Sequence, residues 1–232
     1  MVETVKEKAR GTMSAHKLEI LPQAQRRLWN ELKNTPQEFV LYGGTALALR
    51  LGHRTSEDFD FFSNRPFLPD VLRKTIGYLQ DAEMRQFEEN TLTAIVNRDG
   101  PVKVSFFGGL KLNRVQDPDV MPDNGIKVAS LLDIAATKLA TIQQRAQARD
   151  YEDVLALSGA GVSLSEMLAA AESVYGSTFN GTLSLKALTF FADGDLPTLS
   201  PAIQSRLRTL ASQVSLQQIP LMRARVGVTG AA

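Results

Sequence analysis

Two different spacings of hydrophobic residues follow one another along this chain. In the first half, short apolar runs typical of strands are mixed with helical segments. From Ile126 onward the pattern is helical almost throughout. The predicted strands are 39–42, 58–62, 91–97 and 102–107, and the predicted helices of the first half are 16–33, 45–51 and 70–79. The pattern therefore predicts an α+β fold, with a small mixed sheet within residues 1–120 and a helical bundle within residues 121–232.

A glycine pair lies where the first predicted strand meets the next helix. At Gly43 and Gly44 the backbone can approach a ligand closely, and the first N–H groups of the helix point toward an anion. Thr45 can cap the helix or donate to a phosphate. A phosphate-binding turn and a simple tight turn both fit these residues.

Two carboxylates lie on the predicted strand 58–62. Alternation places Asp58 and Asp60 on one face and Phe59 and Phe61 on the other. Such a half-buried pair is costly unless a cation or another partner neutralises it, and Mg²⁺ is a suitable cation. The alternative is a solvated edge strand. Arg54, just before the strand, is placed to contact a phosphate or brace Asp58, or else it forms a loop ion pair.

A long helix is predicted over 133–157. On one continuous helix, Lys138, Arg145 and Arg149 lie within about 40° of one another, at the border of the apolar face. Asp150 and Asp153 then project onto the apolar side, where Arg149 can pair with Asp153 at spacing i,i+4. These residues fit a salt-bridge cluster that ties the helix to the core, and they also fit a functional site.

Two segments resemble the AbiEii/AbiGii toxin family, a branch of the polymerase-β-like nucleotidyltransferases. Residues 43–62, GGTALALRLGHRTSEDFDFF, are similar to the family's glycine turn and Asp-x-Asp motif. Residues 138–155, KLATIQQRAQARDYEDVL, are similar to its C-terminal pattern of a lysine, two arginines and two aspartates. The resemblance spans about residues 38–157, and the motifs occur in the family's order.

The resemblance implies a magnesium-dependent nucleotidyltransferase that moves a nucleoside monophosphate from an NTP to an acceptor hydroxyl. Residues 1–120 would be the nucleotidyltransferase core with its N-terminal helix, and residues 121–232 a helical domain. Asp58 and Asp60 would hold the metal, while Gly43, Gly44, Thr45 and Arg54 would bind the nucleotide. Lys138 would reach the triphosphate, with Asp150 and Asp153 orienting Lys138 or the acceptor. In related toxins the acceptor is an RNA such as tRNA, and a cognate antitoxin is a possible partner.

One position departs from the family's usual pattern. Enzymes of this superfamily usually carry a third carboxylate on a later strand, where this chain has Ser105. Alternation puts Lys103 and Ser105 on the face opposite Val102, Val104 and Phe106. Either Asp150 or Asp153 substitutes for the missing acid, or catalysis is slow or absent. A small-molecule nucleotidyltransferase and a non-catalytic module that binds nucleotide or antitoxin are therefore the alternatives.

Composition narrows the remaining classes. The chain has no cysteine and two histidines, which excludes disulfides and thiolate metal sites and gives little support to a histidine-rich metal site or a Ser-His-Asp triad. No P-loop motif occurs. The charged N-terminus MVETVKEKAR is unlike a signal peptide and no run is long enough to span a membrane, so a cytoplasmic location is expected. Net charge is +1, but no acidic residue follows Asp195, so the arginine-containing tail is either a solvated surface or an RNA-binding segment.

Overall fold

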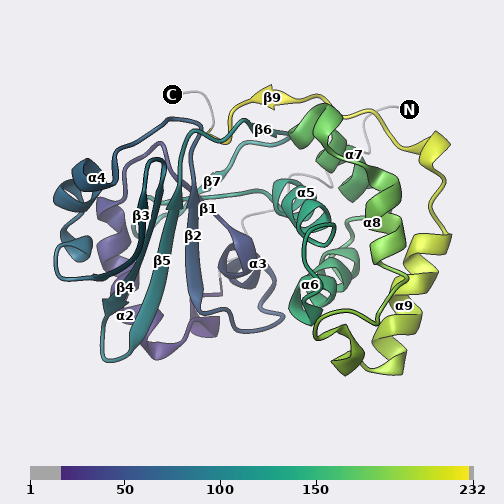
Figure 1. Ribbon diagram of the computed structural model, residues 1–232, viewed down its shortest axis with the longest axis horizontal. Helices are drawn as coiled ribbons and strands as arrows, with labels where there is room; N and C mark the ends of the chain where they lie inside the picture. Colours follow the sequence, from purple (N-terminus) through teal and green to yellow (C-terminus); the bar gives the residue numbers. More distant parts are fainter. Residues whose placement is uncertain (1–16, 230–232) are drawn as a thin grey trace.

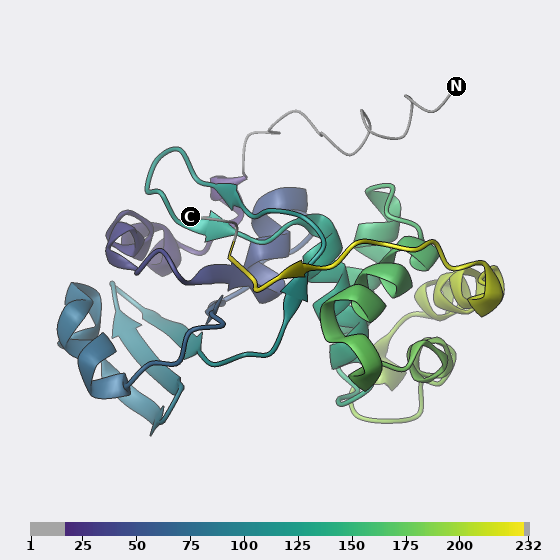
Figure 2. The same ribbon diagram turned by 90° about the horizontal axis from the view of Figure 1, so that it is seen from above.

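The computed structural model describes residues 17–229. His16, the first residue of the predicted opening helix, and the charged N-terminal stretch lie outside the described residues. Figure 1 shows a sheet lobe on one side and a helical lobe on the other, and Figure 2 shows the same two lobes from above.

The sheet lobe is built on a mixed sheet of seven strands. Their order across the sheet is β3-β4-β5-β2-β1-β8-β7. The strands are β1 (Val40–Tyr42), β2 (Asp58–Phe62), β3 (Glu83–Glu88), β4 (Thr91–Asn97), β5 (Pro101–Phe107), β7 (Asp119–Val120) and β8 (Lys127–Val128). The pairs β1–β8 and β2–β5 are parallel, and the other neighbouring pairs are antiparallel.

Helices account for most of the rest of the chain. In the sheet lobe they are α2 (Gln23–Trp29), α3 (Gly43–Leu51) and α4 (Pro69–Thr75). The helical lobe contains α5 (Leu131–Thr141), α6 (Ala148–Gly159), α7 (Leu164–Tyr175), α8 (Gly181–Ala187) and α9 (Pro201–Ser212). Short 3₁₀ turns lie at Leu18–Ile20, Asn30–Asn34, Gly77–Leu79, Gly176–Thr178, Leu196–Thr198 and Leu216–Gln218.

The α+β fold class predicted from the pattern is confirmed, and so are its four strands. The two lobes share one cluster of buried apolar residues, in which Phe61 stacks on Phe106 with ring centroids 5.2 Å apart. Division of the chain near residue 120 stays a prediction. The structure adds that β8 lies beyond that position and pairs with β1 inside the sheet.

Two predicted helices are shorter than expected. The opening helix 16–33 is interrupted because Pro22 is extended and the preceding Leu21 is extended too, as residues before proline usually are. The helix 70–79 ends at Thr75, since Ile76 is extended, and only a 3₁₀ turn follows. Strand β3 was not predicted, because its polar residues are exposed at the sheet edge and show no alternation.

The prediction of one continuous helix over 133–157 was wrong, because the structure has two helices there. The chain leaves the helix after Thr141, Gln147 is extended, and α6 begins at Ala148. Ser130 caps α5 by accepting from the Asp133 N–H, and Asp195 Oδ1 accepts from the Ala148 N–H at the start of α6. Because no glycine or proline lies between the two helices, the sequence carries no local signal for this break.

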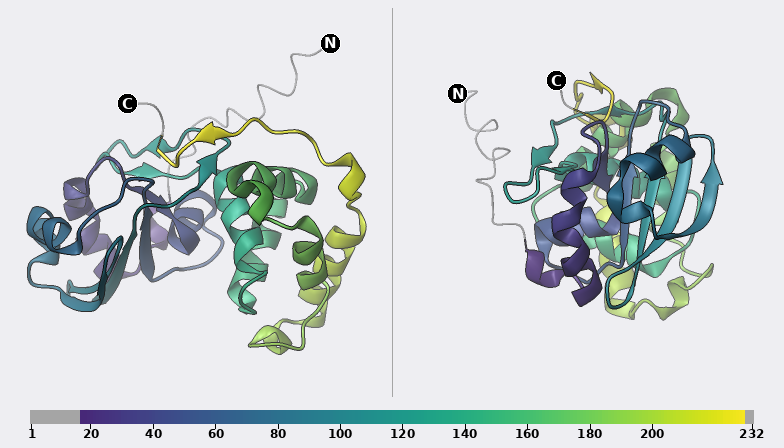
Figure 3. Two further views of the ribbon diagram at one scale, coloured as in Figure 1. Left: turned by 45° about the horizontal axis from the view of Figure 1, so that its top comes forward. Right: turned by 90° about the vertical axis from the view of Figure 1, so that its left-hand side faces the viewer.

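The C-terminal segment returns to the sheet lobe. After α9 it runs back across both lobes, where β9 (Arg225–Val226) pairs with β6 (Asn113–Arg114) in a separate two-stranded sheet (Figure 3). Arg114 is buried and donates to the carbonyls of Val226 and Gly227. These contacts tie the end of the chain to the sheet side.

Within residues 17–229, no single helix combines the length and apolar character needed to cross a membrane. One bent pair, Ala148–Gly159 with Leu164–Thr178, reaches that length and composition only when its two members are taken together, at an angle of 114°.

Candidate nucleotide site

The glycine turn is a position where side chains do not fit. Gly43 has φ of +75°, and a Cβ there would lie 2.7 Å from Asp60 Oδ2. A Cβ on Gly44 would lie 2.8 Å from Arg54 Nη2 and from Ser56 Oγ. The start of α3 has no side-chain cap, so its first N–H groups are available to an anion. The predicted placement of a bare backbone beside the paired carboxylates is therefore present in the structure.

Thr45 is placed differently from its neighbours. It is fully buried, and its Oγ1 donates a hydrogen bond to the backbone carbonyl of Asp58. This bond fastens α3 to β2, and the side chain does not line the cavity that Gly43 and Gly44 face. The expectation that Thr45 contacts phosphate thus gives way to a structural tie between helix and strand.

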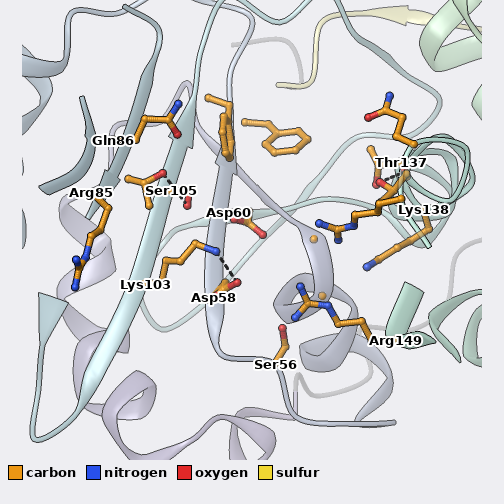
Figure 4. A pocket seen from close by; sticks show the side chains of 18 of the residues that line it. Ser56, Asp58, Asp60, Arg85, Gln86, Lys103, Ser105, Thr137, Lys138 and Arg149 are labelled. Carbon is orange, nitrogen blue, oxygen red and sulfur yellow. Dashed lines mark hydrogen bonds and ion pairs between the residues drawn. The ribbon is translucent and has the colours of Figure 1, made fainter. Parts of the chain in front are cut away.

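Asp58 and Asp60 project from one face of β2, as alternation predicts. Figure 4 shows Lys103 and Ser105 beside them on β5. The Lys103 ammonium lies 2.9 Å from Asp58 Oδ2. Burial and the neighbouring charge of Asp58 raise the pKa of the Asp60 carboxyl. A positive ion bound between the two carboxylates would reduce their mutual repulsion.

A second ion cluster lies behind the cavity wall. Lys138 Nζ is 2.8 Å from Asp150 Oδ1 and 2.6 Å from Asp153 Oδ2, and both aspartates are fully buried. Arg54 binds Asp153 with both Nε and Nη2, at 2.7 and 2.8 Å. The break between α5 and α6 brings these groups together, because it folds α6 back alongside α5.

Two expected ion pairs are replaced in this cluster. Arg54 contacts Asp153 and not Asp58, and His53 Nε2 lies 2.7 Å from Asp153 Oδ1. The predicted i,i+4 pair of Arg149 with Asp153 does not form; Arg149 instead donates to Gln147 Oε1. Both expectations assumed local partners, whereas Asp153 is bound by His53 and Arg54 from a distant part of the sequence and by Lys138 on α5.

The charge partners set the ionisation of the two buried aspartates. Burial by itself raises the pKa of Asp153, but hydrogen bonds from His53 and Arg54 and the charge of Lys138 outweigh it, so the pKa is lowered. At Asp150, burial again raises the pKa. A hydrogen bond from Arg145 and the charge of Lys138 outweigh burial, so the pKa of Asp150 is also lowered. Both carboxylates are thus stable as anions inside the protein.

A cavity of about 690 Å³ lies between the sheet and the helical lobe. Among the predicted site residues, Gly43, Gly44, Arg54, Asp58, Asp60 and Lys138 line it, whereas Thr45, Asp150 and Asp153 do not. Arg85, Lys103, Arg145 and Arg149 add positive charge to its walls. Figure 4 shows Lys138 and Arg149 across the cavity from the two aspartates.

Some of these lining residues were outside the sequence prediction. Arg85 and Gln86 lie on β3, which has no strand signal, and Ser56 lies in the loop before β2. Arg145 and Arg149 were recognised in the helix pattern and in the C-terminal motif that resembles the family, but they had no assigned role at the site. Proximity to the cavity, which depends on the paths of β3 and α6, is what identifies them.

The acidic residues present suit one hard divalent cation. Within the described part of the chain, no group of three or more His, Cys, Asp or Glu side chains could hold a metal. Mg²⁺ is commonly held by one or two carboxylates together with substrate phosphates, and Asp58 and Asp60 supply two. The charge conflict at Asp60 supports this fit.

Comparison with known proteins agrees with the geometry. Residues 27–219 match the family model described as "Nucleotidyl transferase AbiEii toxin, Type IV TA system". An uncharacterized protein from Aquifex aeolicus is 33% identical over 159 residues, which cover 67% of this chain and 75% of that protein.

A solved structure shows the same fold. MenT4, a nucleotidyltransferase toxin from Mycobacterium tuberculosis, superimposes with a TM-score of 0.55 and covers 83% of each chain at 16% sequence identity.

Proposed function

Because this chain belongs to the AbiEii nucleotidyltransferase toxin family, we propose that it transfers a nucleoside monophosphate from an NTP to an acceptor hydroxyl, most simply on an RNA such as tRNA. The observation that carries the proposal is the glycine turn directly beside Asp58 and Asp60, in a cavity with basic walls. The reaction would take place in the cytoplasm, where NTPs and tRNA are present.

Each part of the cavity suits one part of the nucleotide. The α3 N-terminus at Gly43 and Gly44 binds the β- and γ-phosphates through backbone N–H groups. Asp58 and Asp60 would hold Mg²⁺, which would supply positive charge against the phosphates of the nucleotide. The basic groups on the opposite wall stabilise charge that develops on the phosphates.

The chemical step is a displacement at the α-phosphorus. An oxygen of the acceptor hydroxyl forms the new bond to phosphorus, and the bond between the α-phosphorus and the bridging oxygen breaks. The electron pair of the broken bond leaves with pyrophosphate, and the hydroxyl proton passes to solvent. The protein's contribution is positioning and charge stabilisation, which supply most of the catalysis in phosphoryl-type transfers.

Lys138 links the buried ion cluster to the cavity. Its ammonium reaches the cavity wall while Asp150 and Asp153 hold it from behind. We assign Lys138 to the triphosphate, and we assign Asp150 and Asp153 to the orientation of Lys138. Arg54 is held by Asp153 and lines the same cavity. We assign it to phosphate binding as well.

A partner protein follows from the family. A toxin of a toxin–antitoxin system has a cognate antitoxin that counteracts it, so we propose that this chain has one. Growth arrest on expression of the toxin alone, and its relief by co-expression of a neighbouring reading frame, would test this point.

The central test is transfer of label from each of the four NTPs, with Mg²⁺ and total cellular RNA. We expect labelled RNA with at least one NTP. Asp58→Asn and Asp60→Asn should each abolish Mg²⁺-dependent NTP binding and labelling while the fold is kept, because the changes are nearly isosteric and remove only charge. Asp81→Asn, an exposed aspartate outside the cavity, is the matched control.

Two results would contradict the assignment. Unchanged NTP binding in both Asp58→Asn and Asp60→Asn would remove these residues from the site. Labelling of a small molecule, with no RNA labelled by any NTP, would move the proposal to a small acceptor.

A further inference from the structure

Strands β2 and β5 bring an amine and a hydroxyl next to the two carboxylates. In their parallel register Lys103 is the neighbour of Asp58, and Ser105 is the neighbour of Asp60. All four side chains face the cavity. Neighbouring strands lie about 4.8 Å apart, so position 105 is where a third carboxylate would join the pair.

Ser105 cannot act as that third acid. It is 1% exposed, and its Oγ accepts a hydrogen bond from Thr93 Oγ1 at 3.3 Å. Asp150 and Asp153 do not replace it either, because both are fully buried, lie outside the cavity wall and are already bound by cations. In the described part of the chain the carboxylates on this face of the cavity are therefore those of Asp58 and Asp60.

Two-metal sites place their ions about 3.5–4 Å apart and need carboxylates for both. Here one oxygen of Asp58 is already engaged by Lys103, at 2.9 Å. The remaining oxygens of Asp58 and Asp60 suffice for one ion that also binds phosphate. A second ion would find no further acid beside Asp60.

Lys103 is the lysine that contacts the carboxylate pair of Asp58 and Asp60, through Asp58. Lys138 and Arg145, the other cations near Asp60, are bound to Asp150 or Asp153. The sheet order β5-β2-β1 puts Lys103 on the side of Asp58 away from the glycine turn, which follows β1. A nucleotide whose phosphates lie at the glycine turn leaves the Lys103 side for the acceptor.

We propose that this site binds a single divalent cation, and that the Lys103 ammonium supplies the second positive charge on the acceptor side. Lys103 fixes Asp58 and competes with a metal ion for one of its oxygens, while the lack of an acid at position 105 leaves no ligand for a second ion. The inference rests on the proposed nucleotidyl transfer for its catalytic meaning, but the number of ions bound can be measured without any transfer.

The test counts Mn²⁺ ions per chain, with free Mn²⁺ followed by its electron paramagnetic resonance signal. Wild type should bind one ion. Lys103→Met should still bind one ion, about three- to fivefold more tightly, because a competing half-exposed cation has been removed. Nucleotidyl transfer by the same variant should fall about tenfold or more, since a charge-stabilising group is lost.

In Lys103→Met, Mn²⁺ affinity should rise while nucleotidyl transfer falls. These opposite changes distinguish the proposed role of Lys103 from a purely structural role. A general loss of structure would weaken both, and Lys111→Met, exposed and outside the cavity, should change neither. Two further variants test whether position 105 limits the number of ions: the single variant Ser105→Asp and the double variant Lys103→Met/Ser105→Asp. The single variant should bind one Mn²⁺, and the double variant should bind two.

Several results would overturn the proposal. Two Mn²⁺ ions bound by wild type would do so, and so would unchanged or weaker Mn²⁺ binding by a Lys103→Met protein that melts like wild type. If Lys103→Met does not fold, Lys103→Gln replaces it with the same expectations. Absence of labelling with every NTP would count against the nucleotidyl transfer itself, and the ion count would still decide the role of Lys103.

Discussion

Lys138 shows how one side chain can join stability to function. The residue is 5% exposed, and its ammonium lies between two carboxylates that have no contact with solvent. Breaking a buried ion pair from one side leaves an uncompensated charge, which is usually more costly than the pair is favourable. The salt-bridge role inferred from sequence is thus present in the structure, and the proposed phosphate contact is added to it at the cavity wall.

Lys138→Met is expected to lower the free energy of unfolding by about 3–5 kcal/mol, because Asp150 and Asp153 lose a shared partner. Nucleotide affinity should also fall, by about 1.5–3 kcal/mol, the scale of a charge-assisted hydrogen bond. Urea unfolding and equilibrium binding of NTP measure the two effects. Normal nucleotide binding by a destabilised variant would leave Lys138 with a structural role only.

Asp153 predicts how stability depends on pH. Its pKa is lower in the folded protein than in the unfolded chain, where it has its ordinary value, because His53, Arg54 and Lys138 outweigh the effect of burial. The stabilisation is therefore complete above the ordinary aspartate pKa and is lost as pH falls toward the folded value. Wild-type stability should drop below about pH 4. Asp153→Asn should be less stable at pH 7 and should show a shallower drop in acid.

The control for this pH series is Asp81→Asn, which changes an exposed aspartate in a turn. It should keep the wild-type slope. An Asp153→Asn protein whose stability falls as steeply as that of wild type below pH 4 would show that other carboxylates dominate acid unfolding.

At the scale of elements, the break between α5 and α6 has the largest consequence for the site. The connecting residues are held from outside: Gln143 Nε2 donates to Ser184 Oγ on α8, and the α6 N-terminus donates to Asp195. Gly194 packs directly on the carbonyl of Ala146 in this connection. The path of the α8–α9 connection therefore helps to place Asp150 and Asp153 beside Lys138.

Gly194→Ala should destabilise the protein by at least about 1–3 kcal/mol, because φ is +56° there and a Cβ would collide with the Ala146 carbonyl oxygen. Gly159→Ala is the matched control, since a Cβ at this helical glycine meets nothing within 4 Å. It should be neutral or stabilising by up to about 1 kcal/mol. Thermal unfolding of the two variants provides the comparison, and equal melting temperatures would argue against a role for Gly194 in placing α6.

At the scale of the whole molecule, two pairs of arginines that an acceptor would meet lie on different elements. Arg145 and Arg149 line the cavity, whereas Arg206 and Arg208 belong to α9 on the outer side of the helical lobe (Figure 1). Arg208 lies over the ring of Phe191, 4.7 Å from its centroid. Neither Arg206 nor Arg208 lines the cavity, so a small acceptor held there would not contact them, whereas an RNA acceptor would extend beyond the cavity.

Reversal of charge separates these two kinds of acceptor. Arg206→Glu/Arg208→Glu should weaken RNA labelling at low salt, with a smaller effect as salt rises, and should leave NTP binding unchanged. Arg149→Glu should weaken both labelling and NTP binding. Filter assays across a salt series measure this, and equal RNA labelling by wild type and the α9 variant at every salt concentration would remove α9 from acceptor binding.

The sheet was predictable where strands are buried. In β2 and β5, alternate residues enter the core, so the period of two appears in the sequence and gives the faces of Asp58, Asp60, Lys103 and Ser105 correctly. Strand β3 is exposed and polar, and β7 and β8 have two residues each, which is too short for any period. Those strands form because a neighbouring strand offers hydrogen bonds.

The sequence by itself determined the fold class, the glycine turn and the common face of Asp58 and Asp60, because each depends on residues a few positions apart. Only the tertiary structure decided which cations bind Asp153, that Thr45 donates a hydrogen bond to β2, and that the predicted helix 133–157 is two helices. Asp153 and Arg54 are 99 positions apart in the chain, yet their side chains are 2.7 Å apart. A buried charge takes whichever partner the fold brings near, and no local period records that choice.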